Sequence, residues 1–210
     1  MREMIAEHIK TSMAVKQNLL DNELDTILSF CQGVAAIFAG GGKLLICGNG
    51  GSAADAQHLA AELIIRYRSQ PSRRSLPAIA LTTDSSVLTA GGNDLGFDEI
   101  FARQVEGLGQ PGDGILAITT SGNSSNILSA FRRARQTGMT NFLLTGRDGG
   151  RALAEFQSDI DSYITVPADN TAAIQESHLM LLHILCEVVE ATLFSSGRLP
   201  DGHGQTAGGK

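Results

Sequence analysis

Glutamate and histidine side chains that could move protons lie in two distant parts of this chain. His58 and Glu62 are four residues apart in a predicted helix, so they share one face of it. His183 lies in a late, otherwise apolar helix that also carries Gln175. Histidine and glutamate are common general acids and bases near neutral pH, so the two segments predict proton-transfer chemistry. Taken singly, Glu62 also fits a surface carboxylate, and His183 also fits a core histidine.

A glycine-rich loop comes directly before the first of these segments. The stretch 48–52 reads Gly-Asn-Gly-Gly-Ser and joins a predicted strand to the helix of His58. Its glycines let the backbone turn sharply and present N–H groups, and Ser52 can cap the helix or donate to a phosphate oxygen. A tight turn without a ligand is the alternative. We assign four residues of this loop to substrate binding: Asn49, Gly50, Gly51 and Ser52.

A second loop, at 119–124, reads Thr-Thr-Ser-Gly-Asn-Ser and opens another predicted helix. Helix capping needs only one hydroxyl, and this loop has four. Hydroxyls beside helix N–H groups make a neutral cradle for an anion. The predicted binding residues here are Thr119, Thr120, Ser121 and Ser124.

The apolar pattern predicts the frame that positions these residues. Short apolar strands are expected at 43–47, 78–82, 114–119, 141–145 and 162–166. Helical patterns are expected at 2–20, from a cap at Asp21 or Asn22 to about 38, and at 52–68, 85–91, 98–108, 124–137, 149–156 and 171–194. Strands that alternate with helices predict a five-stranded parallel α/β sheet covered on both faces. Both loops then lie at the carboxyl edge of the sheet, where such folds bind ligands.

Composition and charge narrow the classes of protein. Of 210 residues, 42% are hydrophobic and 18% charged, which predicts a globular chain. The net charge of −6 disfavours nucleic-acid binding through a basic face. Three cysteines stand in apolar runs, so we expect reduced core thiols. We expect one domain over 1–194, including N-terminal helices at 2–39, and a disordered tail at 195–210. No signal peptide or apolar run of roughly 20 residues is evident, which predicts a cytoplasmic protein without a membrane span.

Several stretches of the chain resemble those of a known family. The stretches 47–58, 92–94, 120–124, 144–150 and 174–178 are similar to those of bacterial phosphoheptose isomerases, which are sugar isomerase (SIS) domain proteins. The resemblance extends to about Phe194. It implies a flavodoxin-like or Rossmann-like SIS fold and conversion of sedoheptulose 7-phosphate to D-glycero-D-manno-heptose 7-phosphate, for the heptose of the lipopolysaccharide core.

The resemblance also implies roles for particular residues. Glu62 is the expected base and His183 the expected acid in an enediol or enediolate mechanism. Asn93, Asp94 and Gln175 are expected to bind the substrate, although an Asx turn is the alternative for the first two. Zinc is the expected cofactor, and nitrogen and oxygen donors suit it. Its expected ligands are His58, Glu62, Gln175 and His183. A homotetramer with packed N-terminal helices, and no nucleotide cofactor, is expected.

Other functions remain as alternatives. A non-catalytic SIS protein that binds a replication initiator or senses a sugar phosphate would share the loops, but such relatives typically lack the equivalents of Glu62 and His183. An arabinose 5-phosphate isomerase usually carries added regulatory domains, for which no residues remain. A dinucleotide-binding dehydrogenase is disfavoured because the first loop is not G-x-G-x-x-G and no acidic residue ends the second strand. Arg66, Arg73 and Arg74 are interpreted as solvated, with one a candidate to reach the substrate.

Overall fold

The computed structural model describes residues 1–69 and 73–195. Its centre is a five-stranded sheet in the order β2-β1-β3-β4-β5, with every neighbouring pair parallel. The strands are β1 (Leu44–Gly48), β2 (Ala78–Ala80), β3 (Gly114–Thr119), β4 (Thr140–Gly146) and β5 (Ser162–Val166). The predicted fold class and sheet are therefore confirmed.

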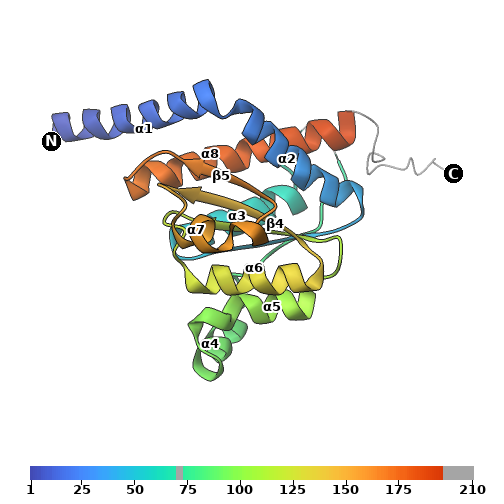
Figure 1. Cartoon of the computed structure of the whole chain (residues 1–210). Helices are drawn as coiled ribbons and strands as arrows, with labels where there is room; N and C mark the ends of the chain where they lie inside the picture. Colours follow the sequence, from blue (N-terminus) through green and yellow to red (C-terminus); the bar gives the residue numbers. More distant parts are fainter. Residues whose placement is uncertain (70–72, 196–210) are drawn as a thin grey trace, which may run out of the picture.

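Helices cover both faces of this sheet, as Figure 1 shows. One face carries α2 (Leu24–Ala39), α3 (Gly51–Ile64) and α8 (Thr171–Glu190), and the other carries α5 (Ile100–Leu108), α6 (Ser125–Thr137) and α7 (Gly150–Phe156). Alternate strand residues serve the two layers: Leu44 and Ile46 face the first core, whereas Leu45 and Cys47 face the second. All four are fully buried, as expected for a parallel strand covered on both sides.

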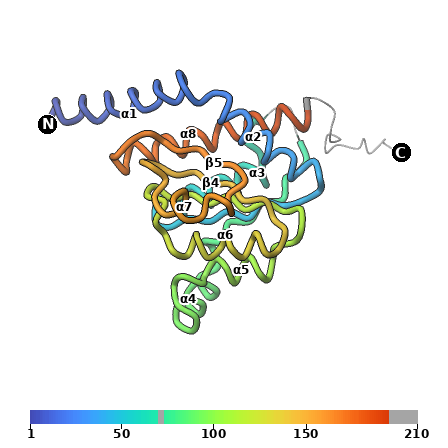
Figure 2. The backbone as a smooth tube through the Cα atoms, in the orientation of Figure 1, coloured from blue at the N-terminus to red at the C-terminus, as the bar shows by residue number. Residues whose placement is uncertain are grey.

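Two helices depart from this layered plan. The N-terminal helix α1 (Arg2–Asn22) projects beyond the body of the molecule, as the backbone tube in Figure 2 shows. The helix α4 (Ser85–Asp94) packs on the short 3-10 turn η1 (Phe97–Glu99) and on α5, and it buries none of its residues. Both helices therefore expose side chains that the rest of the chain does not cover.

The helix predicted over 52–68 ends earlier than expected, at Ile64. The physical reason is the segment that returns after it. The guanidinium of Arg73 donates to the carbonyls of Leu63 (2.8 Å) and Glu62 (2.7 Å), and the backbone N–H of Leu76 donates to Leu63 as well (3.1 Å). These donors satisfy the last helical carbonyls, so no further turn is needed to do so.

Two other local predictions were wrong. The expected cap of the second helix at Asp21 or Asn22 does not form, because both residues still belong to α1 and Glu23 alone separates the helices. The helix predicted over 85–91 continues to Asp94, so Asn93 and Asp94 end a helix instead of forming an Asx turn. The tail predicted to be disordered lies, from residue 196 on, outside the described residues.

The cysteines and the last helix complete the core. Cys31, Cys47 and Cys186 are free and buried, as predicted, and burial raises the pKa of each thiol to about 12. The helical segment Thr171–Phe194, which is α8 and most of the π-helical turn η3 (Ala191–Ser195), is long and apolar enough to cross a membrane by composition. It packs instead against α1, α2, α3 and two strands, as a core helix does.

Candidate active site

The first predicted phosphate loop links β1 to α3 at the carboxyl edge of the sheet. Its chain reversal needs glycine: Gly50 has φ +57°, and a Cβ on Gly48 would lie 2.6 Å from the carbonyl oxygen of Ser52. Gly50 is the N-cap of α3, so Ser52 is a buried residue inside the helix and not its cap. The start of α3 thus lies at this edge, where the N–H groups of Ser52 and Ala53 donate to the carbonyls of Asn49 and Gly50, at 3.1 Å each.

Asn49 of this loop has a partner that the sequence did not reveal. Its side-chain amide exchanges two hydrogen bonds with that of Asn126, at 3.0 and 2.9 Å. Asn126 lies in the first turn of α6 and is 2% exposed. The pair ties the two phosphate loops together across the strand ends. In the sequence, the only sign of this pair is that Asn126 is a polar residue in the first turn of α6.

The second predicted loop joins β3 to α6 and keeps its hydroxyls free of helix capping. Ser124 is the N-cap of α6, but its side chain makes no capping hydrogen bond and lies 3.4 Å from the Thr119 hydroxyl. The Ser121 hydroxyl accepts from the backbone N–H of Asn123 at 3.2 Å. Because no hydroxyl caps the helix, the loop can offer these groups and the helix N–H donors to an anion.

The predicted proton-moving residues meet between α3 and α8. His58 Nε2 lies 2.9 Å from His183 Nε2, and their rings contact edge to face with centroids 5.1 Å apart. Glu62 Oε1 lies 4.0 Å from His58 Nε2. His58 and Glu62 side chains are 38% and 24% exposed, so they lie at the surface of the groove between the helices and not in the core.

Gln175 lies near the start of α3, away from the His58–His183 pair. A Cβ on Gly51 would lie 2.2 Å from Gln175 Nε2, so this amide lies against the first residue of α3. Gly51 is seven residues before His58, or about 10 Å along the helix axis. The structure therefore places Gln175 beside the first phosphate loop and two turns away from the His58–His183 pair.

Asn93 and Asp94 are not brought to this groove within one subunit. They are exposed at the end of α4, and the Asn93 amide donates to Asp94 at 2.7 Å. Because α4 packs on α5, on the opposite layer from α3 and α8, their predicted contact with substrate is not made by the residues of this subunit as described.

Two residues that the sequence did not single out surround the pair. Tyr67 lies over His183 with ring centroids 5.7 Å apart. Asp55, one turn before His58, has a buried Oδ2 without a hydrogen-bond partner among the described residues. Burial raises the pKa of Asp55, and the nearby His58 opposes that shift. In the sequence, Asp55 could have been found from its position three residues before His58, which places both side chains on one face of the helix.

His178 holds α8 against the sheet. It is fully buried, and its ring Nε2–H donates to the carbonyl oxygen of Thr145 at 3.0 Å, at the end of β4. Burial lowers the pKa of His178 to about 4, so the ring is neutral. The adjacent Glu176 instead points to α1, where Ser12 donates to it and His8 Nε2 lies 2.9 Å away. These contacts fix the helix that carries Gln175 and His183.

Two cavities adjoin these groups. One of about 630 Å³ lies between the loops that follow β3, β4 and β5, with Ser121 in its wall. The other, of about 400 Å³, lies beside His183 and Tyr67 and is bounded by Lys16 of α1. The arrangement offers an anion cradle at the strand ends and an acid/base pair in the neighbouring helix groove.

Comparison with known proteins identifies the family of this chain. The family model described as the SIS domain matches residues 7–146. The phosphoheptose isomerase of Roseiflexus sp. is 47% identical over 190 residues, covering 90% of this chain and 93% of the relative. That of Geobacter sulfurreducens is 51% identical over 176 residues, covering 83% and 90%.

Solved structures show the same likeness. A phosphoheptose isomerase from Neisseria gonorrhoeae superposes with a TM-score of 0.83 at 40% identity, covering 90% of this chain and 98% of the other. One from Francisella tularensis has a TM-score of 0.82 at 38% identity, covering 90% and 97%. This chain therefore belongs to the SIS-domain family and, within it, to the phosphoheptose isomerases.

Proposed function

We propose that this protein is an aldose–ketose isomerase that converts sedoheptulose 7-phosphate into D-glycero-D-manno-heptose 7-phosphate. The observation that carries the proposal is the meeting of His58, Glu62 and His183 beside a loop built to hold phosphate. A non-catalytic SIS protein would need the phosphate loops but not this acid/base group. The likeness to phosphoheptose isomerases over nine-tenths of the chain supports the enzyme.

The reaction moves hydrogen between C1 and C2 of the open-chain sugar. Glu62 takes a proton from C1 of the ketose, and the electron pair of that C–H bond forms the C1=C2 bond of an enediolate. His183 gives a proton to O2 and takes one from O1, which leaves the C1 aldehyde when C2 is reprotonated. The phosphate, held at the strand ends, positions C1 and C2 in the helix groove.

Zinc is the cofactor that we propose for this centre. The described residues contain no group of three or more His, Cys, Asp and Glu already arranged around a metal position. The donor types nevertheless fit: two ligand nitrogens on tetrahedral zinc are about 3.3 Å apart, close to the 2.9 Å between His58 Nε2 and His183 Nε2. Glu62 would supply an oxygen and would then be a weaker base, whereas Gln175 lies two turns from this pair, beside Gly51, and does not reach it in this structure. Bound zinc would polarise the substrate carbonyl as a Lewis acid.

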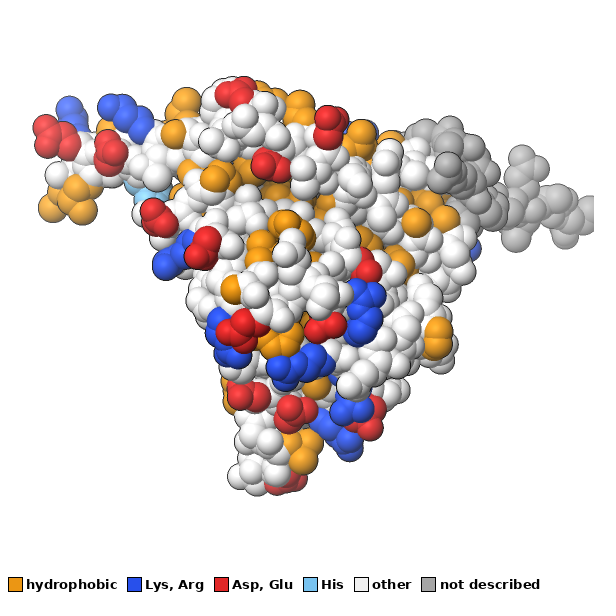
Figure 3. All heavy atoms as spheres, viewed as in Figure 1, with side chains coloured by type: hydrophobic (Ala, Val, Ile, Leu, Met, Phe, Trp, Pro, Cys, Tyr) orange, Lys and Arg blue, Asp and Glu red, His pale blue; other side chains and the backbone are white. Residues whose placement is uncertain are grey.

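A homotetramer in the cytoplasm is the assembly that we propose. Large apolar side chains of α1 are exposed, and Figure 3 shows hydrophobic groups along its projecting end. They include Met4, Ile5, Ile9, Met13 and Leu20. A second subunit would cover this face. The α4 helix of a neighbouring subunit would also bring its Asn93 and Asp94 to the groove between α3 and α8, which α4 of the same subunit does not reach.

Turnover of sedoheptulose 7-phosphate tests the function directly. We expect the purified protein to form the aldose phosphate in a coupled assay, to lose activity with a chelator, and to regain it with added zinc. Full activity after metal removal would contradict the zinc proposal alone. Absence of turnover with and without zinc, in protein that still binds the sugar phosphate, would favour a binding protein.

A further inference from the structure

The loop after β4 carries a cation that the proposed reaction has not yet used. Arg147 is exposed, and its guanidinium makes no hydrogen bond or ion pair with the residues at 1–69 and 73–195. It is also the one non-glycine residue of those ranges with a positive φ, +58°. Left-handed backbone is unfavourable for arginine, so the surrounding structure must impose it. The N–H of Arg147 donates to Val166 at 3.1 Å and fixes the turn.

This loop is locked to the second phosphate loop. A Cβ on Gly122 would lie 1.9 Å from the carbonyl oxygen of Gly149, so the two backbones touch. The N–H of Ala152 donates to the Gly122 carbonyl at 2.9 Å, and the N–H of Arg151 donates to Asn123 Oδ1 at 3.0 Å. A change in one loop would therefore shift the other, and the position of Arg147 is fixed relative to Ser121.

Arg147 and Ser121 line the same cavity of about 630 Å³. Asn123 and the β5–α8 connection, residues 167–169, complete its wall together with Asp148. One carboxylate oxygen of Asp148 accepts from the N–H of Gly150 within its own turn, at 3.0 Å. Asp169 is exposed at the rim. The cavity thus joins one hydroxyl of the phosphate loop, that of Ser121, to one guanidinium, with two carboxylates beside it.

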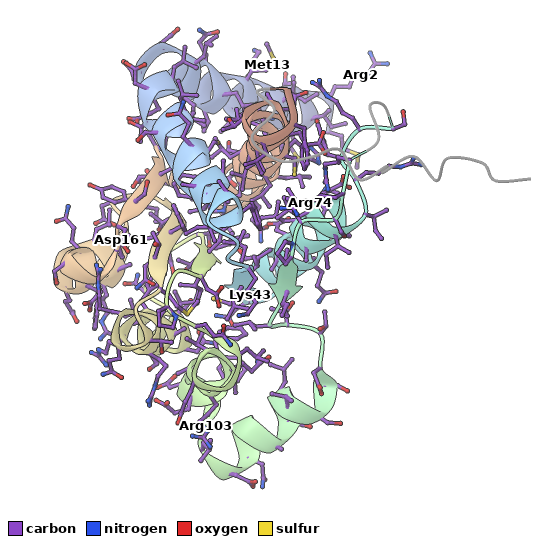
Figure 4. All side chains as sticks on the ribbon, turned by 90° about the vertical axis from the view of Figure 1, so that its right-hand side faces the viewer. Arg2, Met13, Lys43, Arg74, Arg103 and Asp161 are labelled. Carbon is purple, nitrogen blue, oxygen red and sulfur yellow. The ribbon has the colours of Figure 1, made fainter. Side chains whose placement is uncertain are left out.

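A positive partner would strengthen the binding of a phosphate dianion here, because the protein is acidic and the cradle itself is neutral. Two of the arginines after α3 lie elsewhere in this chain. Arg73 and Arg74 lead into the amino end of β2, at the edge opposite the phosphate loops; Figure 4 shows Arg74 on the side that carries Lys43, just before β1. Arg73 is also 3% exposed and paired with Glu190 at 2.5 Å, which corrects its interpretation as solvated.

We propose that Arg147 is the substrate's phosphate-recognising cation, acting with the hydroxyls of the 119–124 loop. The inference rests on the proposed function, and it assigns the residue that selects a phosphorylated sugar. A guanidinium presents paired donors that match two phosphate oxygens. Asp148 and Asp169 line the same cavity, and neither is paired with the Arg147 guanidinium in the structure.

Paired arginine variants test this assignment. Arg147→Ala removes the proposed contact, and Arg151→Ala is the matched control, because it removes the same charge four residues on from a side chain that pairs with Glu155 at 3.2 Å. Arg147→Gly is the second variant, since glycine suits the left-handed backbone and guards against misfolding. Each protein is titrated with inorganic phosphate by calorimetry and assayed with sedoheptulose 7-phosphate.

We expect both Arg147 variants to weaken phosphate binding and raise KM about tenfold, as for loss of one charge-assisted contact, with kcat nearly unchanged. Arg151→Ala should match the wild type in both measurements. Unchanged phosphate affinity in Arg147→Gly and Arg147→Ala would overturn the inference, whatever the turnover. If the wild type binds phosphate but does not turn over the heptulose, the proposed function fails, and the binding comparison still decides the role of Arg147.

Discussion

The phosphate loops and the acid/base groove differ in how completely one subunit builds them. The loops are fixed by contacts inside the chain: backbone against backbone at Gly122 and Gly149, the Gln175 side chain against Gly51, and the Asn49–Asn126 amide pair. The groove is made of side chains, and His58 and Glu62 are 38% and 24% exposed. The proposed anion cradle is thus prepared within the fold, whereas the proposed acid/base residues lie at a surface that is open to solvent.

The largest expected effect comes from the groove. Glu62→Gln keeps the shape of the side chain but removes the base, and we expect kcat to fall about 10³-fold. Phosphate binding and the assembled state should stay as in the wild type, measured by calorimetry and size-exclusion chromatography. Glu106→Gln, on the far layer, is the control. Turnover like that of the wild type in Glu62→Gln would show that another group is the base.

The second prediction concerns the contact between the two loops at Gly122 and Gly149. Gly122→Ala forces a left-handed residue and drives a Cβ into the Gly149 carbonyl, so we expect a loss of about 3 kcal/mol in unfolding free energy and weak phosphate binding. Gly112→Ala has a similar positive φ, +89°, but an open surrounding, and should lose only about 1 kcal/mol. Equal losses, by urea unfolding, would mean that the contact between the two loops carries no stability.

A third prediction concerns the helix that joins the two regions. Burial lowers the pKa of His178 to about 4, against 6.5 for a free histidine. Unfolding therefore takes up a proton below pH 6.5, so the neutral ring stabilises the fold above that pH, and this contribution is lost as pH falls toward 4. We expect the unfolding free energy to drop by about 1 kcal/mol per pH unit across this window.

His178→Gln is the variant that isolates this effect. It keeps a donor for the Thr145 carbonyl but cannot be protonated, so its pH dependence from 6.5 to 4 should be shallower than that of the wild type in urea titrations. Parallel curves for the two proteins would contradict the assignment of this pH dependence to His178.

The fourth prediction concerns the amide pair that joins the loops. Asn49→Ala leaves the buried Asn126 amide without its partner, which costs about 1–3 kcal/mol of stability. Asn126→Ala should cost a similar amount, and the double variant less than the sum. If Asn49 also contacts substrate, its variant alone raises KM further. Additive stability losses in a double-mutant cycle would mean that the pair does not act as a unit.

Much of this molecule was predictable from its sequence, because local patterns determine it. The five apolar strands between helices predicted the sheet, and glycines and hydroxyls predicted where the loops lie. The spacing of His58 and Glu62 predicted one shared helix face. These features depend on residues close together in the chain, so sequence periodicity reveals them.

The features that escaped prediction depend on distant contacts. Arg73 ends α3 through carbonyls ten and eleven residues earlier, which no helical pattern records. Asn126 pairs with Asn49 across 77 positions. The packing of α8 on α3 determines which part of α3 lies beside Gln175 and which part lies beside His183. Arg147 was visible only as part of a motif, because its cavity forms from three separate loops.

The most direct test of the central claim is the fate of hydrogen at C1 and C2 during turnover in deuterium oxide. Sedoheptulose 7-phosphate is incubated with the wild type, and the aldose phosphate is analysed by NMR. Because Glu62 is 24% exposed, its proton should exchange with solvent, and we predict deuterium at C2 of the product. Product that carries no deuterium at C2 would contradict proton transfer through a solvent-exchanging carboxyl at Glu62, and it is the result expected for a direct hydride shift.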